Sequence, residues 1–552
     1  MKTKVNQVKA GAVLNYVQLF LGVIISLVVT PFIIRGLGQS EYGIYNLSAS
    51  TTSYLSLLTL GIGGAYLKFN MKYRVVGDVE GEQRLNATFM VIYIVLGVIT
   101  ALVGTGLVFA ADFMFGESLT ADEIYKTKIV MALNIANMAI ALPFSVFQMN
   151  INAYEKFVFA KLVTILNTVV SPAVRLPIVL LGGKAIEITI AMTAISILTC
   201  VIQMIYALTV LKMGFKFGRM DKKLVWGLFS FSFFIFLNQL IDMINWSMDK
   251  FILGVVSGTA VVAIYTVGAT FNTYTMQFST AISSVLAPRA YKLVESGADK
   301  KEIDEMFIKM GRIQFVLVAF IITAFVFFGK PFIVNIYADE SYIDAYYIGI
   351  LLIVPLIVPL IQNIGLEIQR AMNKHKFRSI VYIGIAIANL AMSIPLAMKF
   401  GGIGSAIGTC VSLLIGNGLI MNIYYDKGMG LNIKKFWWNI LKFLPGLILP
   451  IVVGTLLMIY VDMSNMWVFL GYAVLYTVVY GLSMFFIGMN KYEKGLFLKP
   501  VKKILNKIFK KKAVAVENVE TADDVTIETE NSEVIEDNIE LSNNEDKKNA
   551  SL

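Results

Sequence analysis

Residues 31–47, PFIIRGLGQSEYGIYNL, connect two long apolar runs, and a related stretch, KFILGVVSGTAVVAIYTV, occupies residues 250–267. In both stretches Phe-Ile leads through a short irregular segment to a glycine, Gly38 or Gly258, and an Ile-Tyr pair ends seven residues later. One such match can arise by chance. Its meaning depends on whether other landmarks repeat at the same spacing of 220 residues.

The composition excludes a soluble globular protein. Of the 552 residues, 57% are hydrophobic and only 15% are charged, and the mean hydropathy is +0.72, which leaves too little polar surface to cover a soluble fold. Many apolar runs reach the ~20 residues that a helix needs to cross a hydrocarbon core of ~30 Å. Because helices satisfy their backbone hydrogen bonds within one segment, as lipid requires, the sequence predicts an all-α polytopic membrane protein.

Charge alternates between the connections of these predicted spans. Lys and Arg gather in every second connection, whereas the connections between them carry mostly acids or no charge. By the positive-inside rule both termini are cytoplasmic in the cell membrane. The opposite connections are short, the longest near residues 111–123, which leaves no room for an extracellular catalytic domain. The fourteen predicted spans are residues 10–34, 44–67, 87–110, 124–150, 158–181, 185–210, 224–252, 260–287, 311–336, 343–369, 379–399, 402–424, 440–461 and 467–489.

Further landmarks repeat at nearly the same spacing as Gly38 and Gly258. Spans 1–6 and 7–12 are therefore interpreted as two copies of one unit. Because six is even, both copies enter the membrane in the same direction, and such parallel repeats are typical of alternating-access transporters with a substrate site between the two lobes. The matching pairs, at offsets of 219–221 residues, are Lys156-Phe157 with Lys376-Phe377, Lys68 with Arg289, and Gly182-Gly183 with Gly401-Gly402.

The C-terminal region changes composition. After the last span, lysines alternate with apolar residues at helical spacing, which indicates a basic amphipathic helix on the anionic inner leaflet or an ordinary positive flank. The remaining residues are acidic, lack a long apolar run and are predicted to be disordered. The net charge of +10 reflects membrane orientation and gives no case for nucleic acid. The predicted domains are an N-lobe at 1–210, a C-lobe at 211–435, an added helix pair at 436–490, the basic helix at 491–512 and the acidic tail at 513–552.

Five short motifs resemble one family of membrane transporters. The resemblance covers roughly residues 5–490 and points to the oligosaccharide flippase (polysaccharide export, Wzx-like) family of the multidrug/oligosaccharidyl-lipid/polysaccharide (MOP) exporter superfamily. It implies a V-shaped pair of six-helix lobes that moves a polyprenyl-pyrophosphate-linked oligosaccharide from the inner to the outer leaflet, without covalent change. The motifs are LGQSEYGIYNL at 37–47, SLLTLGIGGAYLKF at 56–69, DKFILG at 249–254, AISSVLAPR at 281–289 and NKHKFRSIVYI at 373–383.

Ionisable residues inside predicted spans are candidate functional residues, because an unpaired charge in lipid is costly. Arg175 lies between Pro172 and Pro177, which free backbone carbonyls, and its guanidinium is suited to a pyrophosphate. The alternatives are a structural ion pair or an interfacial position. Asp242 and Asp249 lie seven residues apart on one helix face, where carboxylates could bind Na⁺ or H⁺ as the coupling ion.

Asp249 could instead pair with its neighbour Lys250 near the end of the span. No other cofactor is expected, and the two cysteines, Cys200 and Cys410, have no metal-ligand spacing.

Other charges flank the spans. Arg35 and Glu41 are interpreted as a gate between the lobes or as solvated loop charges. Lys68 and Arg289, at equivalent positions of the two lobes, could receive the pyrophosphate at the cytoplasmic side or act as plain positive-inside flanks.

Aromatic and amide side chains provide candidate sugar contacts. Tyr45 and Tyr265 are equivalent in the repeat, and Asn272, Tyr274 and Gln277 follow in the eighth span; packing or interface anchoring is the alternative role.

Three rival functions remain open. The lipid II flippase branch of the resembled superfamily carries an Arg-Asp pair in its first helix, whereas residues 22–32 contain no charge, which favours an oligosaccharide repeat unit. A drug or cation antiporter of the multidrug (MATE) branch would require an acidic cavity. A membrane glycosyl polymerase would require a catalytic constellation on a sizeable outer loop. A flippase of this kind is expected to act with glycosyltransferases and a polymerase.

Overall fold

The computed structural model describes residues 7–59, 62–218, 222–372, 374–496 and 498, and within these ranges the secondary structure is helical, with no strand. Short 3-10 or π-helical segments interrupt or extend several α-helices. The α-helices are α1 Gln7–Ser53, α2 Gly63–Val76, α3 Val79–Phe115, α4 Ala121–Ala153, α5 Phe157–Leu180, α6 Ala185–Thr209, α7 Lys222–Val256, α8 Gly258–Glu295, α9 Lys300–Pro331, α10 Ile343–Ile353, α11 Ile357–Ile361, α12 Asn363–Ala371, α13 His375–Leu413, α14 Met421–Ile423, α15 Ile433–Leu441, α16 Leu444–Tyr460 and α17 Met466–Ser483. The shorter segments are η1 Tyr54–Thr59, η2 Phe332–Tyr337, η3 Glu340–Tyr342, η4 Val354–Leu356, η5 Leu414–Ile420, η6 Tyr424–Gly428 and η7 Met484–Gly488.

The chain divides into two compact units, residues 1–481 and 482–552. In the second unit residues 491–496 are helical, and Asn490 caps this helix by accepting a hydrogen bond from the Glu493 N–H at 3.0 Å. The rest of the predicted basic helix beyond residue 498, and all of the predicted acidic tail at 513–552, lie outside the described residues.

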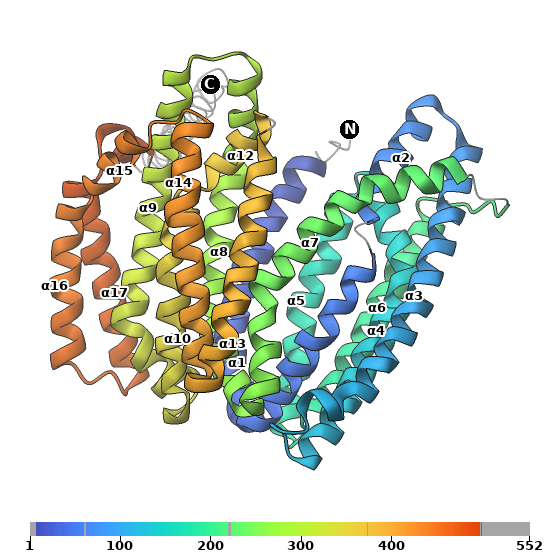
Figure 1. Ribbon diagram of the computed structural model, residues 1–552, viewed down its shortest axis with the longest axis horizontal. Coiled ribbons are helices and arrows are strands. Elements are labelled where there is room, and N and C mark those ends of the chain that lie inside the picture. The colour runs from blue at the N-terminus through green and yellow to red at the C-terminus, as the bar shows by residue number, and fades with distance from the viewer. Residues whose placement is uncertain (1–6, 60–61, 219–221, 373, 497, 499–552) are drawn as a thin grey trace, which may run out of the picture. The chain divides into compact units, whose positions relative to one another are not determined.

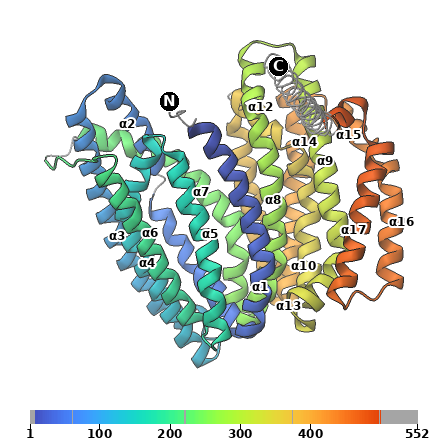
Figure 2. The same cartoon turned by 180° about the vertical axis from the view of Figure 1, so that it is seen from behind.

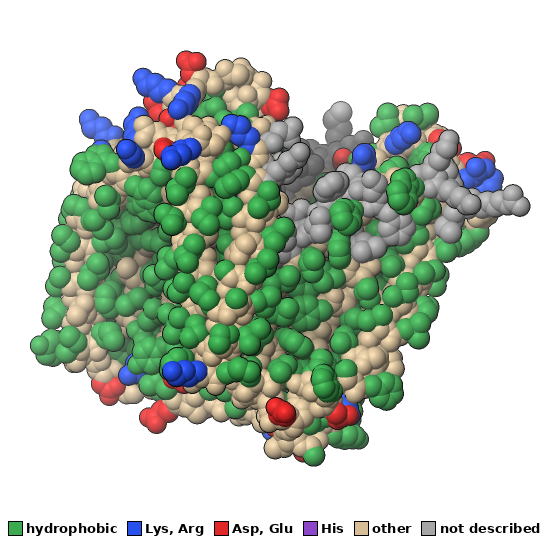
Figure 3. Space-filling view, viewed as in Figure 1, with side chains coloured by type: hydrophobic (Ala, Val, Ile, Leu, Met, Phe, Trp, Pro, Cys, Tyr) green, Lys and Arg blue, Asp and Glu red, His purple; other side chains and the backbone are tan. Residues whose placement is uncertain are grey.

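The protein is a multi-pass membrane protein. Among the described residues, nine helices are long and apolar enough to cross a membrane, or ten if the bent pair α15–α16 counts as one span. Two of the nine, Val13–Thr59 and Phe377–Gly428, each cover two of the fourteen predicted spans, so the count of fourteen stays a prediction. On the face in Figure 3, hydrophobic side chains form a broad band, and many Lys and Arg side chains gather at one end of the helices.

Left-handed backbone conformations recur along the chain at the spacing of the sequence repeat. Gly38 has φ +77° and Gly258 has φ +83°, which a glycine adopts without the steric cost that Cβ would add; Gly182 at +88° and Gly401 at +56° form a second pair. Gly77 at +75° and Gly297 at +66° form a third pair, which the sequence comparison did not identify. The two copies of the repeat therefore have positive φ angles at corresponding glycines.

Gly38 and Gly401 each lie at a kink between two helices. The predicted break between separate spans is confirmed at both positions, because Gly38 (φ 77°, ψ 174°) and Gly401 (φ 56°, ψ −135°) have non-helical dihedral angles inside the ranges of α1 and α13. Each of these two ranges therefore joins two helices that meet at a kink.

Helix α1 lies between two groups of helices. It packs against α4, α5 and α6 on one side and against α7 and α8 on the other, and α8 in turn packs against α9, α10 and α12. Figures 1 and 2 show the same grouping from opposite sides, with α3–α6 together and α8–α10 with α13 together. The elements of the two repeats thus meet along α1, α7 and α8.

Candidate functional site

A polar cavity of about 270 Å³ lies where the two repeats meet. Its cations are Arg175 from α5 and Lys250 from α7, and its described lining contains no Asp or Glu. The Thr266 hydroxyl, although buried, has no hydrogen-bond partner among the described residues, and a buried polar atom of this kind requires a partner. The cavity is therefore suited to an anionic, hydroxyl-bearing ligand. Its other polar lining residues are Ser26, Thr30, Tyr42, Tyr45, Asn46, Thr270 and Tyr337.

A second polar cavity, of about 360 Å³, lies between α1 and α5. It shares Ser26, Thr30, Ile33 and Arg175 with the first cavity, so Arg175 borders both. The other polar side chains, which are Thr164, Asn167, Thr168 and Ser171, come from successive turns of α5. Together the two cavities place one guanidinium among hydroxyl and amide groups.

The Arg175 side chain contacts a sulfur atom and an aromatic ring, and no described carboxylate forms an ion pair with it. Its Nε donates to the Met192 Sδ at 3.0 Å, and its guanidinium lies 5.8 Å from the Tyr45 ring centroid. Pro172 and Pro177 lie inside α5 on either side of it. No ion pair of the described residues involves Arg175 or Lys250, and an intramembrane cation without an acid needs either water or an anionic ligand.

Lys250 is a cavity residue that the sequence analysis did not assign to the site. We considered it as an ion-pair partner of Asp249, but adjacent residues on a helix point about 100° apart. Asp249 instead accepts hydrogen bonds from Tyr265 at 2.7 Å, Ser405 at 2.8 Å and Thr409 at 3.1 Å. Lys250 is left facing the cavity. The sequence feature that could have identified Lys250 as a site residue is a lysine inside a predicted membrane span.

A cluster of oxygen atoms surrounds Asp249, which is 5% exposed. On its far side the Asn389 Oδ1 accepts from Thr409 at 3.1 Å and from Ser393 at 2.6 Å. These groups come from α7, α8 and both sides of the Gly401 bend in α13. One carboxylate among hydroxyl and amide oxygens fits a hard cation or a proton. Among the described residues no group of three or more His, Cys, Asp and Glu could hold a metal.

The other predicted coupling residue, Asp242, belongs to α7, but its side chain lies outside the described part of the structure.

Arg35 connects the two repeats at the end of the helices where Gly38 and Gly258 lie, here called the Gly38 end. Its Nε donates to the Ala338 carbonyl at 3.1 Å, and its Nη2 donates to the Asn335 and Ile336 carbonyls at 3.1 and 3.0 Å. These carbonyls belong to the end of η2, where carbonyl groups lack helical partners. One arginine of the first repeat thus caps a helix of the second.

Glu41 lies at the same end but acts within the first repeat. Its carboxylate pairs with Lys126 at 2.9 Å and accepts from the Ala185 N–H at 3.2 Å, so it joins α1 to α4 and α6. Glu123 makes the contact between repeats that we had predicted for Glu41. It accepts from Ser40 at 2.6 Å and from Thr259 at 2.5 Å.

The backbones of the repeats also touch at the Gly38 end. A Cβ on Gly43 would lie 2.0 Å from the Thr259 carbonyl oxygen, so only glycine permits this approach. The Ser118 hydroxyl donates to the Gly254 carbonyl at 2.6 Å. With Arg35 and Glu123, these contacts hold the two repeats together at this end.

The remaining predicted binding residues are separated by the structure. Tyr45 lines the cavity, but Tyr265 is buried and its hydroxyl is bonded to Asp249, so the two equivalent tyrosines have different partners. Lys68 in α2 and Arg289 in α8 are exposed and do not line the cavity.

On α8 the predicted residues lie on other faces than the cavity. Asn272 is buried, Gln277 is exposed, and the cavity is lined by Thr266 and Thr270, four residues apart. Asn272 follows Thr270 by two residues and therefore points about 200° away from it. The sequence shows polar residues along α8 but not which face meets α1.

An apolar cavity of about 310 Å³ lies between α1, α8 and α9. Tyr274 lines it, and the Tyr274 hydroxyl is 2.5 Å from the Ser26 hydroxyl, which lines both polar cavities. The apolar cavity and the two polar cavities are therefore neighbours, and the contact between α1 and α8 separates them. The apolar lining includes Val23, Leu27, Phe271, Phe278, Phe320 and Phe325.

Several solved transporter structures share this fold. The lipid II flippase MurJ in an inward closed conformation is 14% identical, with 89% of this chain and 99% of that chain covered and a TM-score of 0.62. An inward-facing multidrug resistance MATE family transporter of the MOP superfamily is 14% identical, with 77% and 99% covered and a TM-score of 0.60. A MOP superfamily transporter from Pyrococcus furiosus, described as having a binding pocket of reversed polarity, is 13% identical, with 77% and 96% covered and a TM-score of 0.52.

The family assignment rests on the sequence, because identities this low show the fold alone. No curated protein matches the chain. The model of a family described as "Polysaccharide biosynthesis protein" matches residues 8–294, which is more than half of the chain. The chain belongs to this polysaccharide biosynthesis protein family.

Proposed function

We propose that the protein is a flippase that moves polyprenyl-pyrophosphate-linked oligosaccharide repeat units from the inner to the outer leaflet by alternating access. The observation that carries this proposal is the cavity between the repeats, where Arg175 and Lys250 occur without a carboxylate in the described lining. Two cations suit the charges of a pyrophosphate, to which a guanidinium can donate two hydrogen bonds at once. The hydroxyl and amide groups around them suit sugars.

The apolar cavity supports an amphiphilic substrate. It adjoins the polar cavities across the Tyr274–Ser26 contact, so a polyprenyl tail could remain in an apolar environment while the headgroup occupies the polar space.

A cationic drug is a poorer fit, because two cations in the cavity would repel it. A glycosyl polymerase is disfavoured because only residues 116–120 separate α3 from α4 at the Gly38 end.

The contacts at the Gly38 end support a direction of entry. By the positive-inside rule this end would lie outside the cell and both termini would lie in the cytoplasm. With Arg35, Glu123 and Gly43 closing that end, the present arrangement would receive substrate from the cytoplasmic side. Glycosyltransferases would supply it there, and a polymerase would use the flipped repeat units outside.

The Asp249 cluster is the proposed coupling site. Binding of Na⁺ or H⁺ would replace hydrogen bonds that now join α7, α8 and α13. These helices belong to the second repeat, and Lys250 follows Asp249 directly on α7. Occupation of the cluster could therefore change how α7 presents Lys250 to the cavity.

Binding of a polyprenyl pyrophosphate to the purified full-length protein tests the proposal. The double variant Arg175→Ala/Lys250→Met should weaken binding by roughly 100-fold or more, since each charge-assisted contact contributes about 1.5–3 kcal/mol. Arg370→Gln removes a surface cation that pairs with Glu367 and should bind as the wild type does. Equal binding by all three proteins would refute the cavity as the headgroup site.

A further inference from the structure

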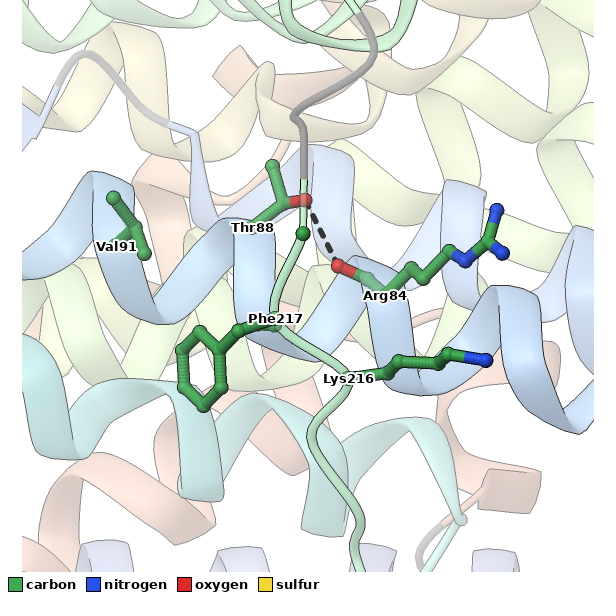
Figure 4. A pocket seen from close by; sticks show the side chains of 7 residues that line it. Arg84, Thr88, Val91, Lys216 and Phe217 are labelled. Carbon is green, nitrogen blue, oxygen red and sulfur yellow. Dashed lines mark hydrogen bonds between the residues drawn. The ribbon is translucent and has the colours of Figure 1, made fainter.

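A third polar pocket, of about 300 Å³, lies at the start of α3, away from the cavities between the repeats. Its cations are Arg84 of α3 and Lys216 of the segment that links α6 to α7, and Phe217 and Val91 form its apolar part. Figure 4 shows the Arg84 and Lys216 side chains extending in the same direction, with Val91 and Phe217 on the other side of the pocket. Charged and apolar groups are thus separated within one pocket.

Hydrogen bonds hold Gly214 and Lys216, in the segment that links α6 to α7, against α3. The Lys216 N–H donates to the Gln83 carbonyl at 3.1 Å, and the Asn86 Nδ2 donates to the Gly214 carbonyl at 3.0 Å. Gly214 lies so close to Gln83 that a Cβ would be 2.7 Å from the Gln83 Nε2. This close approach positions Lys216 beside Arg84.

Glu80 orients both cations without neutralising them. It pairs with Arg84 and, at 2.8 Å, with Lys216, so the three side chains carry a net charge of plus one. The Arg84 and Lys216 side chains remain 65% and 51% exposed. Their free N–H groups can therefore donate to an anionic group in the pocket.

The pocket continues into an apolar stripe along α3. Residues three and four apart on a helix share a face, and Arg84, Thr88 and Val91 begin such a series. Its continuation is exposed, with Val95, Val98 and Leu102 each at least 50% exposed. The Thr88 hydroxyl donates to the Arg84 carbonyl at 2.8 Å, so this face of α3 presents a cation followed by aliphatic side chains, in the order of the headgroup and acyl chain of a phospholipid.

We infer that this pocket binds the phosphate headgroup of an anionic phospholipid, with an acyl chain along α3. A soluble phosphate compound would use Arg84 and Lys216 but would gain nothing from Val95, Val98 and Leu102. A zwitterionic headgroup would place its own cation near a cationic pocket. The bound lipid bridges α3 and the segment between the two repeats, and this inference does not depend on the proposed substrate.

Native mass spectrometry of the full-length protein tests the assignment. Wild-type protein titrated with phosphatidylglycerol should retain more lipid than with phosphatidylcholine of the same chains. The Arg84→Gln/Lys216→Gln variant should lower phosphatidylglycerol retention about tenfold or more, because it removes two charge-assisted contacts. The matched control, Lys309→Gln/Arg370→Gln, removes two other cations that each pair with one acid and should retain the wild-type level.

A second variant separates the two halves of the pocket. Phe217→Ser keeps both cations and should lower phosphatidylglycerol retention without changing the weak binding of glycerol 1-phosphate. If glycerol 1-phosphate displaces the lipid at equal concentration, the ligand is a soluble phosphate and the lipid assignment fails. Equal retention by wild type and Arg84→Gln/Lys216→Gln, with equal thermal unfolding midpoints, would also overturn it.

Discussion

Arg175 shows how a single charge defines the candidate site. It borders both polar cavities, and among the described residues its contacts are the Met192 sulfur and the Tyr45 ring. Neither contact offsets a full positive charge, since a cation over an aromatic ring gains only about 0.5–2 kcal/mol. An anionic ligand would supply the missing partner, so the geometry of the guanidinium should matter as well as its charge.

Replacement of Arg175 by Lys separates geometry from charge. Arg175→Lys keeps the charge but cannot make two parallel hydrogen bonds to one phosphate, so it should bind a polyprenyl pyrophosphate more weakly than the wild type and more tightly than Arg175→Ala. Titration of the three purified proteins checks this order. If Arg175→Lys and Arg175→Ala bind equally weakly, the hydrogen-bond geometry is essential; wild-type binding by Arg175→Ala would exclude the headgroup role.

Asp249 is the residue at which ion dependence should be lost. Asp249→Asn keeps one of the two oxygen atoms that accept from the hydroxyls of Tyr265, Ser405 and Thr409, replaces the other by an amide donor, and removes the charge that attracts a cation or proton. Transport should become insensitive to Na⁺ and proton gradients, while binding to the cavity persists. Transport in proteoliposomes with each gradient imposed separately measures this. Glu305→Gln, a control at an exposed carboxylate that pairs with Lys309, should respond as the wild type does, and the same response from Asp249→Asn would contradict the coupling role.

At the scale of elements, the contact of α1 with the start of α8 holds the Gly38 end closed. Gly43 and Thr259 come from corresponding turns of the two repeats, and their backbones approach too closely for any side chain on Gly43. Arg35 adds three hydrogen bonds to the end of η2. All these contacts would have to break for the cavity to open at this end.

Gly43→Ala should shift the protein toward opening at the Gly38 end. The added Cβ would lie 2.0 Å from the Thr259 carbonyl oxygen, so the two turns must separate. A cysteine introduced at Thr270, on the cavity wall, should then react faster with an impermeant maleimide from outside the cell when Cys200 and Cys410 are replaced by Ser. Gly106→Ala is the control, because no atom lies within 4 Å of its Cβ position. An unchanged labelling rate in folded Gly43→Ala would refute the closed contact.

At the scale of the whole molecule, the two copies of the repeat correspond in their backbone dihedral angles as well as in their sequence. Gly38 with Gly258 and Gly182 with Gly401 take left-handed conformations at corresponding points. An L-residue with a positive φ angle of this kind costs roughly 1–3 kcal/mol. Both copies of the repeat therefore depend on glycine at the same turns, although the atoms around each glycine differ.

Alanine at the two equivalent glycines should have unequal effects. Gly38→Ala should lower the free energy of unfolding by roughly 1–3 kcal/mol through backbone strain alone, because Gly38 combines φ 77° with ψ 174° and no atom lies within 4 Å of its Cβ position. Gly258→Ala should cost more, because its Cβ would also lie 2.8 Å from the Ser118 carbonyl oxygen. Denaturation of the purified variants in detergent measures both. A larger loss for Gly38→Ala would contradict this assignment of strain.

The sequence predicted the helical fold and the repeat, but it did not show toward which neighbouring helix each side chain points. The apolar runs identified an all-helical membrane protein, and the repeat located glycines that later proved left-handed, because both signals depend on local spacing. Lys250, Thr266 and Glu123 were missed as site residues because their roles depend on which face of α7, α8 or α4 meets the other repeat. Glu41 was assigned to contact between repeats for the same reason, since its partners Lys126 and Ala185 are distant in sequence.

The most direct test of the account is translocation of a polyprenyl-pyrophosphate-linked oligosaccharide across proteoliposomes that contain the purified protein. Exposure of the sugar in the opposite leaflet can be followed with an impermeant glycosidase. Wild-type protein and Arg370→Gln should move the lipid, and Arg175→Ala/Lys250→Met should not, although it inserts and folds. Equal translocation by the double variant, or none by the wild type with a matched oligosaccharide, would contradict a flippase that works through this cationic cavity.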